Sequence, residues 1–247
     1  MKELAINCDM GEAFGIYHLG DDEQVMPFVT HANIACGFHA SDPLVMWDTV
    51  RTARKHGLRI GAHPGLADKE GFGRREMKLS RREVAALILY QTGALKSFLA
   101  AEGVLLSHIK PHGALMGMAM RDNQVAEGVA DAVLALGVPI IACADSEMTH
   151  VFDARGVEYS CEFYADLDYD DEGRQIIAVT HEAIDPAVSA ARVLQALKSG
   201  TAQSVNGKTV RVTADTVCVH SDTPNAIAIA KAVYAVMTEH LHSDGAK

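Results

Sequence analysis

The sequence predicts an α/β fold in which a parallel sheet closes into a barrel that is covered by helices. Two observations lead to this prediction. Short apolar segments alternate with helix-length segments along residues 1–247, which is the pattern of βα units in a parallel sheet. Polar groups also recur directly after the apolar segments, as they do where an active site forms at the carboxyl ends of barrel strands. Seven or eight such units favour one closed barrel domain, with an open doubly wound sheet as the alternative.

Composition limits the classes of protein to consider. The formal net charge of −10 argues against non-specific nucleic-acid binding, which needs a basic face. Five cysteines, with Cys8, Cys36, Cys143 and Cys218 in expected strands, indicate buried free thiols in a reducing cytoplasm. We find no signal peptide and no apolar stretch long enough to span a bilayer, so we expect a cytoplasmic protein without a membrane partner.

The N-terminal third alternates strands and helices as a barrel requires. Strands are expected at residues 4–8, 31–36 and 59–62. Asp42 and Pro43 predict the start of a helix that Gly57 ends, since proline suits a first turn and glycine a helix end. A glycine-rich loop then follows the third strand and extends to Arg75.

The remainder continues this alternation. Ser80 and Glu83 predict a capping box for a helix that reaches about residue 101. Further helices are expected at 123–136, 185–199 and 223–241, and further strands at 105–109, 139–143, 159–163 and 216–219. An acidic loop occupies 166–173, and 243–247 should form a frayed tail. The pair Asn206-Gly207 predicts a tight hairpin, because it readily adopts positive φ.

Carboxylates and histidines follow the expected strands. Asp9 and Glu12 come after the first strand at a glycine turn, where paired carboxylates can bind a divalent ion or act as base and acid. Four histidines also follow strands, namely His39, His63, His112 and His220. A capping role for either carboxylate and a structural role for any single histidine remain alternatives. Because all these groups follow strands, we expect one site assembled from the whole fold.

Lys110 is placed between a buried strand and His112. In a barrel mouth its ammonium loses water and must be matched by a carboxylate or an anionic ligand. A structural ion pair with Asp9 or Glu12 is the alternative to a catalytic role. Asp222 lies two residues after His220 and can share the same side of the strand end.

The loop from Gly71 to Arg75 has a composition typical of anion binding. Glycines allow the backbone to approach a ligand, and arginine forks bind carboxylate or phosphate. Consecutive arginines point in different directions, so only one of Arg74 and Arg75 should face the site. A solvated basic loop is equally compatible with these residues.

Motifs covering nearly the whole chain closely resemble those of the LamB/YcsF family. They are Asn7-Cys8-Asp9-Met10-Gly11-Glu12, Ala32-Asn33-Ile34-Ala35-Cys36-Gly37-Phe38-His39-Ala40, Gly61-Ala62-His63-Pro64, Gly71-Phe72-Gly73-Arg74-Arg75, Lys110-Pro111-His112-Gly113-Ala114-Leu115 and Cys218-Val219-His220. The resemblance implies a seven-stranded, deacetylase-like barrel. It also implies cleavage of 5-oxoproline to glutamate coupled to ATP hydrolysis, as in the A subunit of bacterial 5-oxoprolinase, which acts with subunits B and C. Within these motifs we assign Asn7, Asn33, Arg74 and Arg75 to substrate binding.

Three positions depart from the family pattern. Leu167 stands where the family usually has an arginine, a second family arginine is missing within 175–180, and Ser221 replaces a glycine. If either arginine holds a substrate carboxylate, this chain acts on a different lactam or amide.

The residues and the resemblance suggest a common mechanism. No phosphate-binding loop of the G-x-x-x-x-G-K-[ST] type occurs, so we expect partner subunits to handle most of the ATP chemistry. Asp9 or Glu12 would act as the base, the histidines would shuttle protons or hold a metal, and Lys110 would stabilise negative charge on oxygen.

Two other classes of function remain open. In a stand-alone metal-dependent deacetylase or amidohydrolase, Asp9, His63 and His112 would be the ligands around an open position. The second is a non-catalytic binding protein within the complex. Assembly into a homo-oligomer is compatible with each of these.

Overall fold

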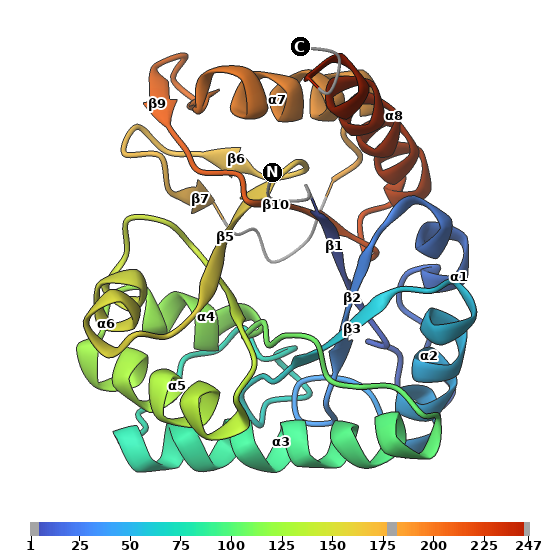
Figure 1. Cartoon of the computed structure of the whole chain (residues 1–247), viewed down its shortest axis with the longest axis vertical. Helices are drawn as coiled ribbons and strands as arrows, with labels where there is room; N and C mark the ends of the chain where they lie inside the picture. Colours follow the sequence, from blue (N-terminus) through green and yellow to red (C-terminus); the bar gives the residue numbers. More distant parts are fainter. Residues whose placement is uncertain (1–4, 177–181, 245–247) are drawn as a thin grey trace.

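The barrel is built on six parallel strands, seen in a computed structural model that describes residues 5–176 and 182–244. In spatial order the strands are β3 (Arg59–His63), β2 (His31–Ala35), β1 (Ala5–Met10), β10 (Thr216–His220), β5 (Tyr159–Tyr164) and β4 (Ile140–Ala142). The strands surround the middle of the molecule and the helices lie outside them (Figure 1). The predicted parallel barrel is therefore confirmed.

The seventh expected strand, at 105–109, is reduced to a bridging segment. Ile109 forms isolated parallel bridges to Ala62 of β3 and to Ile140 of β4, which closes the ring between the two outermost strands. The amide of Lys110 donates to the Ala62 carbonyl at 2.9 Å. Pro111 has no amide hydrogen with which to extend this ladder. The expected count of seven strands is thus corrected to six strands and one bridging segment.

The longer helices expected from the sequence are present. They are α2 (Pro43–Lys55), α3 (Arg81–Ala101), α5 (Asn123–Leu136), α7 (Pro186–Ser199) and α8 (Ala226–Asp244). The Asp42 carboxylate accepts from two amides of the first turn of α2. Ser80 and Glu83 form the capping box of α3. Since α8 continues to Asp244, the expected tail from 243 is helical at its start, and 245–247 lie outside the described residues.

Four short helical segments were not predicted. They are α1 (Asp22–Val25), the 3-10 turn Met26–Phe28, α4 (Gly113–Ala119) and α6 (Glu147–Arg155). Two small antiparallel hairpins complete the fold, one pairing β6 (Asp168–Tyr169) with β7 (Gln175–Ile176) and one pairing β8 (Thr201–Gln203) with β9 (Thr209–Arg211). The β8–β9 turn has Gly207 at φ +79°, as the Asn-Gly pair predicted. The expected acidic loop contains β6.

Helix α3 corrects the expectation that no apolar stretch could span a bilayer. By length and composition alone, this helix of 21 residues could cross a bilayer, because an 18-residue window within it has a mean hydropathy of 1.4. In the fold, one face of α3 is buried and packs along α5 (Figure 1). Val84, Ile88 and Leu95 are buried in that face. A third of that apolar window is buried inside the fold.

Candidate active site

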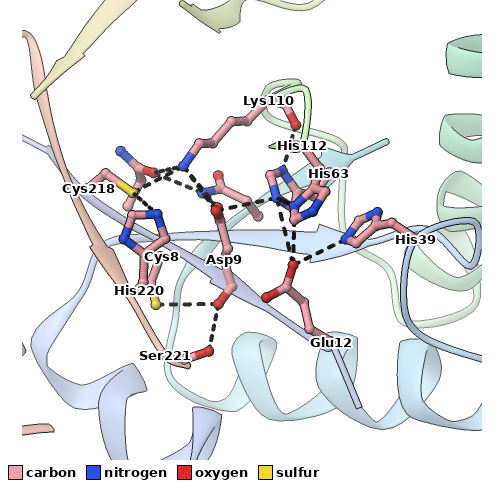
Figure 2. A network of polar contacts seen from close by, with 12 residues as sticks. Cys8, Asp9, Glu12, His39, His63, Lys110, His112, Cys218, His220 and Ser221 are labelled. Carbon is pink, nitrogen blue, oxygen red and sulfur yellow. Dashed lines mark hydrogen bonds and ion pairs between the residues drawn. The ribbon is translucent and has the colours of Figure 1, made fainter. Parts of the chain in front are cut away.

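The register of the sheet brings the strand-end groups together. Asp9 lies opposite Asn33 of β2 on one side and opposite His220 of β10 on the other. His63 ends β3, and Lys110 and His112 follow the bridging segment. Figure 2 shows Asp9 at the centre, with His220 on one side and the His63–Glu12 group on the other. The strand-end groups therefore lie together at the carboxyl ends of the strands.

Lys110 is buried in a cage of oxygen and sulfur acceptors. Its Nζ lies 3.0 Å from Asp9 Oδ1 and 3.1 Å from Glu162 Oε2. It also donates to Cys218 Sγ at 3.1 Å and to Asn7 Oδ1 at 3.3 Å. The ion pair considered for Lys110 thus forms with Asp9 and not with Glu12. Its second partner, Glu162, was not expected.

The charges around Asp9 favour its ionised form. Burial raises the pKa of Asp9, but nearby His63 and Lys110 outweigh burial and hold that pKa well below its usual range. Burial in turn lowers the pKa of Lys110, while Asp9, Cys218 and Glu162 together hold it well above its usual range. The Lys110 ammonium lies 3.0 Å and 3.2 Å from the two Asp9 oxygens, so each ion stabilises the other. The pair is therefore charged at neutral pH.

Glu12 has the opposite environment and sits among three histidines. Its Oε1 lies 3.1 Å from His39 Nε2, 3.4 Å from His112 Nδ1 and 3.9 Å from His63 Nε2. Burial, followed by the negative charges of Asp9 and Asp222, raises the pKa of Glu12 well above its ordinary value. Two neighbouring carboxylates with opposite pKa shifts are the usual sign of different roles in acid–base chemistry.

Backbone carbonyls orient two of these histidines. Nδ1 of His63 donates to the Lys110 carbonyl at 2.7 Å, and Nε2 of His112 donates to the Phe72 carbonyl at 2.7 Å. In the neutral rings, the other two nitrogens then carry lone pairs, and these atoms lie only 3.0 Å apart. A carbonyl acceptor behind each ring is the usual arrangement that aims histidines at a metal.

The cluster of Glu12, His39, His63 and His112 fits a divalent cation. One ligand atom from each residue lies within 4.8 Å of all the others. Burial lowers the pKa of His39 and of His112 well below the ordinary value, so these rings are neutral, as ligands must be. Compared with the predicted ligand set of Asp9, His63 and His112, the structure adds His39 and Glu12. Asp9 remains adjacent, with Oδ2 3.3 Å from His63 Nε2.

His220 is backed by a carboxylate that the sequence did not reveal. His220 Nδ1 lies 2.9 Å from Asp166 Oδ1, and the His220 amide donates to Asp166 Oδ2 at 2.8 Å. Burial lowers the pKa of His220, but Asp166 and then Cys218 outweigh it and raise that pKa well above its ordinary value. Asp166 follows β5, so the same strand-end reasoning could have found it.

The polar groups line a cavity of about 50 Å³. Asp9, Glu12, His63, Lys110, His112 and His220 reach it from the barrel, and Arg74, Pro111, Gly113, Met116, Tyr164, Leu167 and Asp222 complete its wall. Arg74 faces inward, with its guanidinium 3.4 Å from Asp222 Oδ2. Arg75 points away, is 63% exposed and pairs with Asp68. One arginine therefore faces the site, as expected for consecutive residues.

The two asparagines assigned to substrate binding lie beneath the cavity. Asn33 Nδ2 donates to Asp9 Oδ1 at 2.8 Å and to Asn7 Oδ1 at 2.9 Å. Asn7 Nδ2 in turn donates to the Thr216 hydroxyl at 3.0 Å. Both amides are fully buried and do not line the cavity: Asn33 holds the Asp9 carboxylate, and Asn7 accepts from Asn33 and from Lys110. Leu167, where the family pattern has arginine, is part of the cavity wall; the second departure extends into 177–180, outside the described residues.

Comparison with known proteins gives consistent matches over the whole chain. The LamB/YcsF family model matches residues 4–244. The lactam utilization protein lamB of Emericella nidulans is 43% identical over 96% of this chain and 95% of its own. The A subunit of 5-oxoprolinase from Geobacillus thermodenitrificans is 43% identical over 96% of this chain and 94% of its own length. The crystal structure of a lactam utilization protein from Thermus thermophilus superposes with a TM-score of 0.89, at 38% identity, covering 96% of this chain and 97% of that one.

Proposed function

This chain belongs to the LamB/YcsF family, and from its site we propose that it is the hydrolytic A subunit of an ATP-dependent 5-oxoprolinase. The reaction would convert 5-oxoproline to glutamate. The observation that carries the proposal is a buried site with one ionised carboxylate, one carboxylate of raised pKa and one carboxylate-backed histidine around a single cavity. Hydrolysis of an amide needs a general base, a general acid and a fixed charge, and these groups can supply them.

Glu12 is the better of the two candidate bases. A general base works best when its pKa lies near the operating pH, and the pKa of Glu12 is raised whereas that of Asp9 is depressed. Glu12 also lines the cavity, beside the two facing ring nitrogens of His63 and His112. A water held there can therefore pass its proton to Glu12 as it attacks the ring carbon.

His220 is placed to act as the acid for the leaving nitrogen. Its Nδ1 is bound to Asp166, so the other ring nitrogen carries the exchangeable proton on the side of Cys218, whose Sγ lies 4.0 Å away. Opening the lactam requires protonation of the ring nitrogen as the C–N bond breaks. The ammonium of Lys110 faces the same cavity and would stabilise charge on the carbonyl oxygen.

ATP enters this scheme through the partner subunits, B and C. An unstrained lactam is a poor electrophile, and phosphorylation of its oxygen activates the ring carbon. Water then adds to that carbon, the ring nitrogen leaves as the amine, and hydrolysis of the remaining acyl phosphate gives glutamate and phosphate. The buried free thiols of all five cysteines support a cytoplasmic location for the complex.

The decisive experiment is an ATP-dependent 5-oxoproline assay of this chain with and without subunits B and C. We expect glutamate formation only in the assembled complex and negligible ATP hydrolysis by the chain alone. Robust 5-oxoproline-stimulated ATPase activity of the isolated chain would contradict the assignment of the ATP chemistry to subunits B and C. Full turnover after Glu12→Gln or His220→Gln substitution would instead favour a non-catalytic binding role.

The cluster of Glu12 and three histidines supports a second candidate, a metal-dependent amidohydrolase. A divalent cation bound there would act as a Lewis acid and would activate a water. Metal analysis of the purified chain, and its melting temperature with and without added Zn²⁺, would test for binding independently of turnover. His63→Ala should abolish a Zn²⁺-dependent rise in melting temperature, whereas substitution of the exposed His150 to Ala should preserve it. Lactam hydrolysis by metal-loaded chain without ATP would favour this candidate.

A further inference from the structure

His108 is a buried histidine next to the site that neither the motifs nor the cavity includes. It belongs to the bridging segment that closes the barrel and is only 4% exposed. It lies two residues before Lys110 in the same segment. Its ring therefore belongs to the layer of side chains directly beneath Asp9.

Both ring nitrogens of His108 have hydrogen-bond partners. Nε2 lies 2.6 Å from Asn33 Oδ1, and Nδ1 lies 2.5 Å from the Ser107 hydroxyl. The amide nitrogen of Asn33 is already directed at Asp9 and Asn7, so its oxygen faces the ring. Consequently Nε2 carries the proton and donates to Asn33, while Nδ1 accepts from Ser107.

The fold makes room for this ring and keeps it neutral. A Cβ at position 61 of β3 would lie 2.3 Å from His108 Nε2, so only glycine fits there. Burial, followed by the positive charges of His31 and Lys110, lowers the pKa of His108 to about 3. His108 is therefore a fixed dipole at neutral pH and does not exchange protons with the site.

We propose that His108 is a positioning residue, which fixes the orientation of the Asn33 amide and through it the carboxylate of Asp9. With the Nε2 proton in place, the amide must present its NH₂ group to Asp9. Without that donor, the amide can rotate and turn its oxygen toward the carboxylate, where like partial charges repel. The inference deepens the proposed function, because it rests on Asp9 serving in hydrolysis.

Two substitutions separate positioning from packing. The amide nitrogen of His108→Gln can reach the place of Nε2 and donate to Asn33, whereas His108→Met has similar bulk and no donor. In the assembled complex we expect kcat for 5-oxoproline to fall about tenfold or more in His108→Met, with KM nearly unchanged, and to stay within about threefold in His108→Gln. Equal kcat in the two variants would overturn the proposal, even if both melt at a lower temperature.

Substitution of Gly61, with substitution of Gly93 as the control, gives an independent test that leaves His108 in place. Gly61→Ala displaces the ring and should lower kcat as His108→Met does. Gly93→Ala, in α3 with open space around its Cβ, should leave kcat unchanged and serves as the control. Normal kcat in a folded Gly61→Ala variant would count against the proposal.

Nitrogen-15 NMR of the histidine rings distinguishes failure of this inference from failure of the proposed function. We expect His108 in the unmodified chain to be the neutral tautomer with its proton on Nε2. Observation of a proton on Nδ1, or of an imidazolium at neutral pH, would overturn the positioning role whatever the reaction is. If the complex does not hydrolyse 5-oxoproline but the tautomer is as expected, the proposed function fails and the hydrogen-bond assignment stands.

Discussion

Replacing Lys110 with Met tests whether the buried ammonium serves the chemistry or only the fold. Methionine keeps much of the apolar stem and removes the charge. In the structure, Lys110 is 2% exposed and is shared by the carboxylates of Asp9 and Glu162. The substitution therefore leaves two buried carboxylates without their common cation.

The size of the stability loss follows from this geometry. Breaking a buried ion pair by removing one partner costs about 3–5 kcal/mol. For a chain of this length, each kcal/mol lowers Tm by about 2–4 °C, so we expect Tm to fall by roughly 6–20 °C. Lys96→Met, on the exposed side of α3, is a matched control that should leave Tm nearly unchanged.

The pH dependence of this loss has a defined sign. The pKa of Asp9 is depressed in the folded state, so its contribution to stability is present above the unfolded pKa and disappears as pH falls through the folded pKa. Without Lys110 the folded pKa of Asp9 rises. The Tm deficit of Lys110→Met should therefore be largest at neutral pH and should shrink as the solution becomes acidic.

The kcat of the same Lys110→Met preparation decides between a catalytic and a structural role for Lys110. If Lys110 stabilises charge on the reacting oxygen, kcat of the assembled complex should fall by about a hundredfold or more, as for loss of one preorganised donor. A folded variant with unchanged kcat would remove Lys110 from the chemistry and leave it a structural ion pair. A Tm equal to that of the unmodified protein would refute the stability argument.

Two further substitutions test the wall of the cavity. Asp166→Asn removes the anion behind His220, so the pKa of that histidine should fall and the alkaline limb of the kcat–pH profile should move to lower pH. Substitution of the exposed Asp168 to Asn is the control. If the alkaline limb does not move in Asp166→Asn, His220 is not the acid. Leu167→Arg restores the cation of the family pattern to the cavity wall and should lower KM for 5-oxoproline roughly tenfold, the lower end of what a charge-assisted hydrogen bond contributes. An unchanged KM would show that position 167 does not read the substrate carboxylate.

Strand-end reasoning anticipated which polar groups lie together, because parallel strands end at one edge of a sheet. Asp9, His63 and His220 were predicted to meet, and their strands belong to one parallel sheet, in which β1 pairs with β10 and β2 lies between β1 and β3. What the sequence could not supply was the pairing of individual groups. Whether Lys110 meets Asp9 or Glu12 depends on side-chain direction inside the barrel, which sequence spacing does not define.

Two of the missed residues, Glu162 and His108, precede the strand ends instead of following them. Glu162 is inside β5, where a charged residue in a buried strand could have signalled a buried partner. His108 lies two residues before Lys110, and that spacing alone places both on one side of an extended segment. Of the capped helices, α2 and α3 were located to within a few residues, whereas α6, which has a capping box at Ser146, was not recognised. The uncapped α4 was not recognised either.

Glu12 differs from the other carboxylates of the site in the charges that surround it. Asp9 is matched by Lys110, and Asp166 is matched by His220. Among the described residues no lysine or arginine pairs with Glu12, whose neighbours are histidines, so its buried carboxyl takes up a proton more readily than that of Asp9 and can also hold a divalent cation. If Glu12 holds a proton before the metal binds, titrating Zn²⁺ into metal-free protein in weakly buffered solution should release about one proton. Glu12→Gln should bind Zn²⁺ more weakly and release none, and equal release from both proteins would show that the proton comes from another group.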